Sequence, residues 1–351
     1  MQTNIGIRIK SSRIQKGFSL QEVADRIGVS KQMISKYEQG NSMPNSEKLI
    51  ALSKLYNRKI DFFFKKPEVQ IGEINFRKKS KFSVKRVNSL KEEIRIQIEN
   101  YLYIENICNL NTSFENPISE LSINSKSDIF DAVKELRKSW KIGFDTIHNI
   151  IELLEDNEIK VIEVEDETLL FDGLATIIDE KYYVIVVNKS MPIERKRFTL
   201  LHELGHLLLK IQTDEPKEKE KFCNNFASEM LLSEEIAKVE FGEKRSSINF
   251  EELKNVQEKY GISISAIIYK LGDAKIISQE KVKSFYILVN TKPEVKKQID
   301  ETRFDGFENS SKYENLVYRA VSEELISMSK ASSLLQKSLE ELKQELSINI
   351  S

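Results

Sequence analysis

Two histidines and a glutamate carry the strongest chemical signal in this sequence, in the pattern His202-Glu203-x-x-His206. A helix is predicted over residues 195–209, and residues four apart lie on one helical face, so both imidazoles project to the same side. Glu203 is offset by one residue and can reach a metal-bound water without being a ligand. In zinc peptidases the metal lowers the pKa of this water toward about 7, and the glutamate takes its proton. We therefore predict a zinc ion on His202 and His206, with Glu203 as the catalytic base.

The motif is hard to obtain by chance, because the chain has only 3 His. At this frequency an HExxH pattern should occur in roughly a few per thousand such chains. The alternative is a pair of hydrogen-bonded histidines buried on a core helix. Leu200, Leu201 and Leu204 make the helix apolar, and both interpretations require that.

A catalytic zinc site needs a third protein ligand and an open fourth position. No histidine follows His206, so the ligand should be a carboxylate on the next predicted helix, residues 218–232. Glu220 shares a helical face with small residues that would let this helix lie close to the first. Glu229 is nine residues further on, about 180° around the helix, and should point elsewhere. We favour Glu220 as the third ligand, with Glu218 and Glu215 as the alternatives.

Other residues near the motif have a structural explanation and a functional one. Cys223 could touch the metal or sense oxidants, but a buried free thiol is the simpler interpretation. Tyr182 and Tyr183 lie on a strand that could pair with an extended substrate, although ordinary packing is favoured. Arg195 and Arg197 could hold substrate carboxylates, but solvation at the start of the helix is preferred.

Charge is distributed unevenly along the 351 residues. The total is 54 Lys+Arg against 55 Asp+Glu, a net charge of -1. Residues 1–66 contain 13 basic and 5 acidic residues, a net charge of +8, and the remainder has -9. A basic module joined to an acidic body indicates separate functions, with nucleic acid a candidate partner of the first. The two cysteines, Cys108 and Cys223, form no disulfide framework and fit a reducing, cytoplasmic location.

The basic module has the layout of a helix-turn-helix. Ser19 begins a capping box, Gly28 ends that helix, Ser30 caps the next one and Gly40 ends it. A fourth helix follows Asn45, with inward positions predicted at Leu49, Ile50, Leu52 and Leu55. The second helix has an outer face that could enter the major groove, made of Lys31, Gln32, Ser35 and Lys36. Gln32 could bind an adenine edge, whereas lysine and serine would mostly hold phosphates. A small helical bundle with a solvated basic face is the alternative.

Two family resemblances extend these inferences. The stretch containing SLQEVADRIGVS and ISKYEQG, about residues 5–64, resembles the XRE (Cro/C1-type) helix-turn-helix family, whose residues matching Lys31, Gln32, Ser35 and Lys36 face DNA. DGLATIIDEKYYVIVVNKSMPIERKRFTLLHELGHLLL and EKFCNNFASEMLL resemble the ImmA/IrrE family of zinc metallopeptidases. That resemblance implies zinc ligands at His202, His206 and Glu220 and a catalytic base at Glu203. Ser233 departs from the proline often found there.

The remaining pattern predicts an α+β chain. We expect helices over 89–107, 128–140, 144–156 and 250–269 (a pair around Gly261), and two over 312–345. We expect strands over 160–164, 174–178, 182–187 and 283–290, with a hairpin turn at Asp179-Glu180. The predicted domains are a helix-turn-helix domain (1–66), a linker and connecting helix (67–110, the linker over 67–88), a zincin-like metallopeptidase domain (111–275), and a C-terminal strand and helical appendage (276–351).

The sequence thus predicts a DNA-binding regulator with zinc endopeptidase activity. The resemblance implies a double-stranded DNA operator as one partner and a helix-turn-helix repressor, or the chain itself, as the substrate. A homodimer is a further expectation, and no membrane segment is read. The alternative is a non-proteolytic regulator or antitoxin with a structural or sensing metal site, which would not require Glu203. A body that binds no metal is a third hypothesis.

Overall fold

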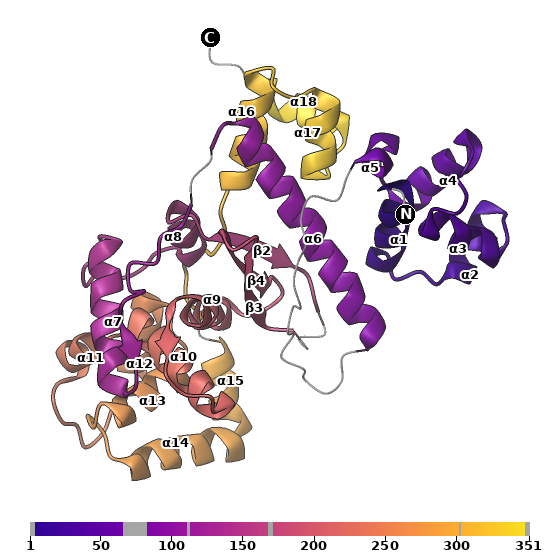
Figure 1. The fold of residues 1–351 in the computed structure, drawn as a ribbon. Helices are drawn as coiled ribbons and strands as arrows, with labels where there is room; N and C mark the ends of the chain where they lie inside the picture. Colours follow the sequence, from indigo (N-terminus) through magenta and orange to yellow (C-terminus); the bar gives the residue numbers. More distant parts are fainter. Residues whose placement is uncertain (1–3, 66–82, 111–112, 168–170, 302, 348–351) are drawn as a thin grey trace. The chain divides into compact units, whose positions relative to one another are not determined.

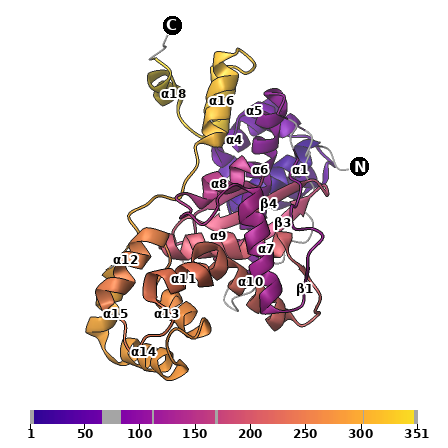
Figure 2. The same ribbon diagram turned by 90° about the vertical axis from the view of Figure 1, so that its left-hand side faces the viewer.

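The protein is described by a computed structural model that covers residues 4–65, 83–110, 113–167, 171–301 and 303–347. The chain forms two compact units, one of residues 1–112, 178–180 and 311–351, the other of residues 113–177 and 181–310. The architecture is mixed α+β and mostly helical, as predicted (Figures 1 and 2). Among the described helices, none is long and apolar enough to cross a membrane. Most of the predicted linker over 67–88 lies outside the described residues.

Five short helices begin the first unit: α1 (Asn4–Gln15), α2 (Leu20–Ile27), α3 (Lys31–Gln39), α4 (Ser46–Tyr56) and α5 (Ile60–Phe64). The predicted capping box is confirmed, since Ser19 Oγ accepts from Glu22 N at 3.1 Å and Ser19 N donates to Glu22 Oε2 at 2.6 Å. Gly28 and Gly40 end α2 and α3 with positive φ angles of 68° and 75°. These signals set α2 and α3 side by side around one apolar core.

The first unit also contains a long helix and a C-terminal helical group. Helix α6 (Val84–Ile107) is followed, far along the chain, by α16 (Lys312–Ser322), α17 (Met328–Leu335) and α18 (Leu339–Glu345). Ile104 and Cys108, at the C-terminal end of α6, share a buried cluster with Leu316 and Val317 of α16. Figure 1 shows these last helices grouped at that end of α6.

Three details predicted for the first unit are wrong. Ile50 is 43% exposed, because the buried stripe of α4 runs through Leu49, Leu52 and Tyr56, and Ile50 lies beside it. The helix predicted from residue 89 begins at Val84. The final predicted helix is two helices, because Gln336 has a φ of 56° and ends α17 before α18 begins.

The second unit surrounds two small sheets with helices. Strands β2 (Lys160–Val164), β3 (Gly173–Ile178) and β4 (Tyr182–Asn188) form one sheet in the order β2-β4-β3, and β2 is parallel to β4 with Lys160 opposite Val184. The predicted turn is confirmed, since Asp179 and Glu180 have positive φ angles of 50° and 55°. Strands β1 (Ser122–Ile123) and β5 (Lys210–Ile211) form a parallel pair.

Helix α9 (Ile193–Leu208), which contains the His202 and His206 motif, lies at the centre of this unit. It packs on β4 and against α10 (Pro216–Leu231), and α10 in turn packs against α7 (Lys126–Ser139). The surrounding helices are α8 (Ile150–Asp156), α11 (Glu234–Phe241), α12 (Phe250–Tyr260), α13 (Ile264–Asp273), α14 (Gln279–Thr291) and α15 (Pro293–Glu301). Leu200, Leu201 and Leu204 of α9 are fully buried in the main core. The helix is therefore held on several sides.

Two predictions for the second unit are wrong. The helix predicted over 144–156 begins only at Ile150, because the backbone carbonyls of Asp145 and Ile147 accept hydrogen bonds from arginine side chains. The strand predicted over 283–290 belongs to helix α14. Its β-branched and aromatic residues favour a strand locally. Phe285 and Tyr286 instead pack against the core as part of a helix that Val282 fits onto Gly272 of α13, so tertiary packing overrides the propensity.

Candidate metal centre

Helix α9 places the two histidines of the motif on one side, where α10 crosses it. His202 and His206 Nε2 atoms lie 3.2 Å apart. Gly205, between them, allows the close approach of α10, because a Cβ there would lie 3.3 Å from Cys223 Cα and 3.3 Å from Phe226 Cδ1. A larger residue at position 205 would push the two helices apart. Gly205 therefore has a packing role that the spacing of the two histidines did not indicate.

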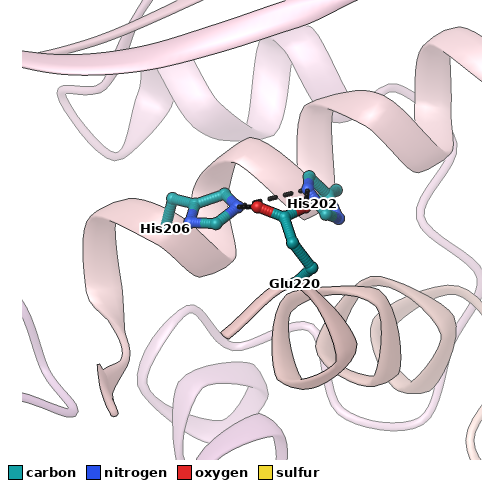
Figure 3. Close-up of side chains that lie close together, drawn as sticks. All are labelled: His202, His206 and Glu220. Atoms are coloured by element: carbon teal, nitrogen blue, oxygen red, sulfur yellow. Dashed lines mark hydrogen bonds and ion pairs between the residues drawn. The ribbon is translucent and has the colours of Figure 1, made fainter. Parts of the chain in front are cut away.

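Glu220 on α10 meets both imidazoles (Figure 3). Its Oε2 is 3.6 Å from His202 Nε2, and its Oε1 is 3.8 Å from His206 Nε2. One donor atom from each of the three residues falls within 4.8 Å of the others. A tetrahedral zinc with bonds of about 2.0–2.2 Å requires donor atoms about 3.3–3.5 Å apart. The three donors fit a zinc ion with small adjustments.

Burial around this cluster leaves one side accessible. The His202 side chain is 8% exposed, His206 is 25% exposed and Glu220 is 40% exposed. A ligand set of two nitrogens and one oxygen, buried at one end and open at the other, is the kind of site that leaves a fourth position for water or substrate. A closed structural zinc site would use four protein ligands.

The other carboxylates considered as third ligand lie elsewhere. Glu229 is buried on the far side of α10, where it forms an ion pair with Lys270 of α13 and accepts a hydrogen bond from Glu234 N. Glu215 and Glu218 are exposed at the start of α10. Among the described residues, the group that could hold a metal consists of His202, His206 and Glu220. The expectation that Glu229 points elsewhere is confirmed.

Glu203 is 5% exposed and lies against the first residue of β3. A Cβ on Gly173 would be 3.2 Å from Glu203 Cγ and 2.6 Å from Thr199 Cγ2, so only glycine fits under this face of α9. Gly173 thus lets α9 pack closely on β3 at the position of Glu203, the predicted base. Sequence reasoning missed this position, and the only local signal was the Asp172-Gly173 pair at the start of the strand.

Cys223 contacts one of the metal-binding histidines. Its side chain is fully buried, as expected for a free thiol, and its Sγ is 3.5 Å from His206 Nδ1. If His206 Nε2 faces a metal, Nδ1 carries the proton and donates a hydrogen bond to the sulfur, which fixes the ring orientation. Helical periodicity predicted the face on which Cys223 lies, but it did not predict this contact.

The tyrosines and arginines near the motif have structural contacts. Tyr183 packs edge-on against Phe114 with ring centroids 4.8 Å apart, as favoured. Its strand, β4, is central in the three-stranded sheet and already has a neighbour on each side. Arg195 pairs with Asp172 and is 43% exposed. The expectation of solvation is wrong for Arg197, which is fully buried and forms an ion pair with Glu308.

The predicted DNA-facing residues lie on α3 in the first unit. Lys31, Gln32 and Lys36 are exposed, and Ser35 is half-buried with its Oγ 3.3 Å from Gln39 Nε2. Ile34 and Tyr37 face the core, as predicted. The helix therefore presents a basic and amide-bearing surface while its opposite face holds the domain together.

Comparison with known proteins divides the chain in the same way. Residues 9–63 match the helix-turn-helix family model, and residues 158–272 match the family described as IrrE N-terminal-like domain. The HTH-type transcriptional regulator ImmR of Bacillus subtilis is 32% identical over 66 residues, which are 19% of this chain and 52% of ImmR. The SPbeta prophage-derived uncharacterized HTH-type transcriptional regulator YonR of Bacillus subtilis is 37% identical over 65 residues, 18% of this chain and 60% of YonR.

These matches have a limited extent. The chain spans about half the length of the curated relatives it matches, 52% of ImmR and 60% of YonR. The apo form of ComR from S. thermophilus aligns over 96% of this chain and 100% of ComR, at 14% identity. Its TM-score of 0.18 is too low to establish a shared fold.

Proposed function

Because this chain joins a helix-turn-helix domain to an IrrE N-terminal-like domain, we propose that it is a DNA-binding regulator with zinc-dependent endopeptidase activity. The observation that carries the peptidase half is the convergence of His202, His206 and Glu220, with donor atoms within 4.8 Å, around an HExxH helix. In this proposal the DNA-binding domain is residues 1–66, and residues 67–110 connect it to the peptidase domain. The peptidase domain is residues 111–275, and residues 276–351 form a C-terminal appendage.

The proposed chemistry is hydrolysis of a peptide bond. Zinc, when bound by His202, His206 and Glu220, supplies Lewis acidity toward water and a carbonyl oxygen. Glu203 takes a proton from the attacking water as it adds to the carbonyl carbon, and delivers the proton to the leaving amine as the C–N bond breaks. Strand β3 is at the edge of its sheet and begins beside Glu203, so an extended substrate paired with β3 would pass the base.

The DNA-binding half rests on α3. In this proposal Gln32 reads a base edge, and Lys31, Ser35 and Lys36 hold phosphates of a double-stranded operator. The exposure of Lys31, Gln32 and Lys36 on α3 supports it. We propose that the substrate is a helix-turn-helix repressor or another copy of this chain, that the protein acts in the cytoplasm, and that a homodimer binds the operator.

A non-proteolytic regulator with a sensing metal site is the second candidate. The observation that favours it is the Cys223 thiol, 3.5 Å from His206 Nδ1, because peptide hydrolysis does not require a thiol in contact with a metal-binding histidine. The two candidates share the metal and differ in whether Glu203 is needed.

The metal content of the purified chain separates both candidates from the third hypothesis, in which the protein binds no metal. We expect about one zinc per wild-type chain, and a loss of affinity on the order of 10³-fold in Glu220→Ala, since one of three ligands is removed. Elemental analysis and competition with a chromophoric chelator measure both. Glu218→Ala, two residues away and exposed, is the matched control and should retain zinc. Metal-free wild-type protein, or full retention in Glu220→Ala, would refute the assignment.

A further inference from the structure

A short segment outside the matched family region is attached to the first turns of α9. Residues 303–310, which we call the strap, follow α15 and lead into α16. Phe304 N donates to Glu194 Oε1 at 2.8 Å, and Lys196 Nζ donates to the Glu308 carbonyl at 2.8 Å. Phe304 and Glu308 are buried, whereas Phe307 between them is 62% exposed. The strap therefore contacts α9 through its two buried residues, Phe304 and Glu308.

The centre of this attachment is a fully enclosed ion pair. The side chains of Arg197 and Glu308 are 0% and 1% exposed. Glu308 Oε2 also accepts from Ile150 N at 2.8 Å and Ile151 N at 3.2 Å, at the start of α8. Burial raises the pKa of Glu308, and Arg197 opposes that shift. Each charge needs the other, because an unpaired charge at such depth is strongly unfavourable.

Arg197 joins the strap to two further parts of the unit. Its guanidinium donates to the carbonyls of Ile147, at 2.6 Å, and Gly261, at 3.1 Å, and lies 4.5 Å from the centroid of the Phe304 ring. A Cβ on Gly261 would lie 2.3 Å from Arg197 Nε, so the end of α12 is shaped for this side chain. With the Glu308 carboxylate removed, the guanidinium would keep its carbonyl partners and lose the carboxylate that pairs with it directly.

Arg197 acts on the opposite side of α9 from the proposed metal ligands. At 100° per residue it lies about 140° from His202 and about 180° from His206 around the helix. The histidines face Glu220 on α10, while Arg197 contacts the residues just before α8, the end of α12 and the strap on the opposite side. A metal site requires donor positions correct to about 0.2 Å. Small rotations or shifts of α9 therefore change the fit of the histidines to the metal.

We propose that Glu308 is a positioning residue that acts through Arg197, and that the strap holds α9 in the orientation required for metal binding. This inference rests on the metal centre proposed above. Along the chain, the strap leads directly into α16. Metal affinity would then depend on a segment beyond residues 158–272.

The test compares full-length wild type with Glu308→Gln, which keeps the shape and removes the charge. We expect zinc affinity to fall about 10–100-fold, as for other residues that orient metal ligands. Cobalt in place of zinc gives visible absorption bands that depend on coordination geometry, and we expect these bands to change. Loss of stability alone would not alter the cobalt bands of the folded fraction.

Glu38→Gln is the matched control, since Glu38 is a buried carboxylate paired with Arg13, in the other unit, and should leave zinc and cobalt binding unchanged. If Glu308→Gln does not fold, Arg197→Met combined with Glu308→Met removes both charges and decides the question with the same readouts. A folded variant with wild-type affinity and wild-type cobalt bands overturns the strap proposal. Absence of metal from the wild type refutes the metal centre, and the positioning role with it.

Discussion

Helices α3 and α9 carry the candidate functional residues of the two units, and they differ in how those residues are supported. On α3, Lys31, Gln32 and Lys36 are exposed on a nine-residue helix whose ends are fixed by Ser30 and Gly40. On α9, His202 and Glu203 are 7% and 5% exposed within a helix packed on several sides.

The difference separates two ways of building a site. Side chains exposed on a capped helix act on an outside partner one at a time, and the fold does not depend on them. Buried side chains act only together with residues that packing brings to them, such as Glu220 from α10. Substitutions on α3 should therefore change DNA binding without changing stability. Substitutions on α9 should affect a site whose side chains depend on one another.

The largest expected effect is on α9. Glu203→Gln should lower the cleavage rate by about 10²–10⁴-fold, because the amide cannot take the proton, while zinc content stays unchanged. The assay incubates zinc-loaded enzyme with a tagged copy of the chain that carries Glu203→Gln, or with a helix-turn-helix repressor, and locates cuts by mass spectrometry. Glu258→Gln, exposed on α12, serves as control. A Glu203→Gln enzyme that cuts at the wild-type rate would favour the non-proteolytic candidate.

The next effect is on α3. Gln32→Ala should weaken binding to an operator, selected from a random duplex pool, by about 1–3 kcal/mol, because paired hydrogen bonds to a base are lost. Stability should change by no more than about 0.5 kcal/mol. Lys36→Ala should instead weaken binding to all duplexes and reduce the salt dependence. Lys54→Ala on α4, exposed but outside α3, is the control. Equal losses on specific and random DNA in Gln32→Ala would contradict base reading.

The smallest effect concerns the cap of α3. Ser30 Oγ accepts from Met33 N at 3.2 Å, so Ser30→Ala should destabilise the first unit by about 1 kcal/mol. Faster hydrogen exchange of the first α3 amides would report this loss. The single tryptophan, Trp140, belongs to the second unit, so its fluorescence transition in urea should not move. A shift of that transition would show that the two units do not unfold independently.

Local signals in the sequence predicted much of the fold. The capping box at Ser19, the left-handed glycines at 28 and 40, and the turn at Asp179-Glu180 depend on hydrogen bonds and φ angles within a few residues, which the sequence specifies directly. The failures have the opposite character. Residues 283–290 favour a strand by composition and are helical because Phe285 and Tyr286 of α14 pack against the core, where Tyr286 Oη donates to the Ser265 carbonyl of α13.

The candidate site divides along the same line. His202, Glu203 and His206 were set by spacing on one helix, and helical geometry alone placed Glu220 and Glu229 on opposite faces of the next. Their roles in metal binding and catalysis remain predictions. No local pattern indicated that Gly173 lies under Glu203, that Gly205 admits α10, or that Cys223 contacts His206.

The sequence by itself determined which side chains share a helical face and where helices begin and end, because these depend on backbone geometry over a few residues. Only the tertiary structure decided which faces meet. Glu220 reaches the histidines because Gly205 lets two helices approach closely, and Glu308 reaches Arg197 across 111 residues of chain. Such contacts follow from the packing of the whole unit, in which buried charges must find partners and buried apolar faces must be covered.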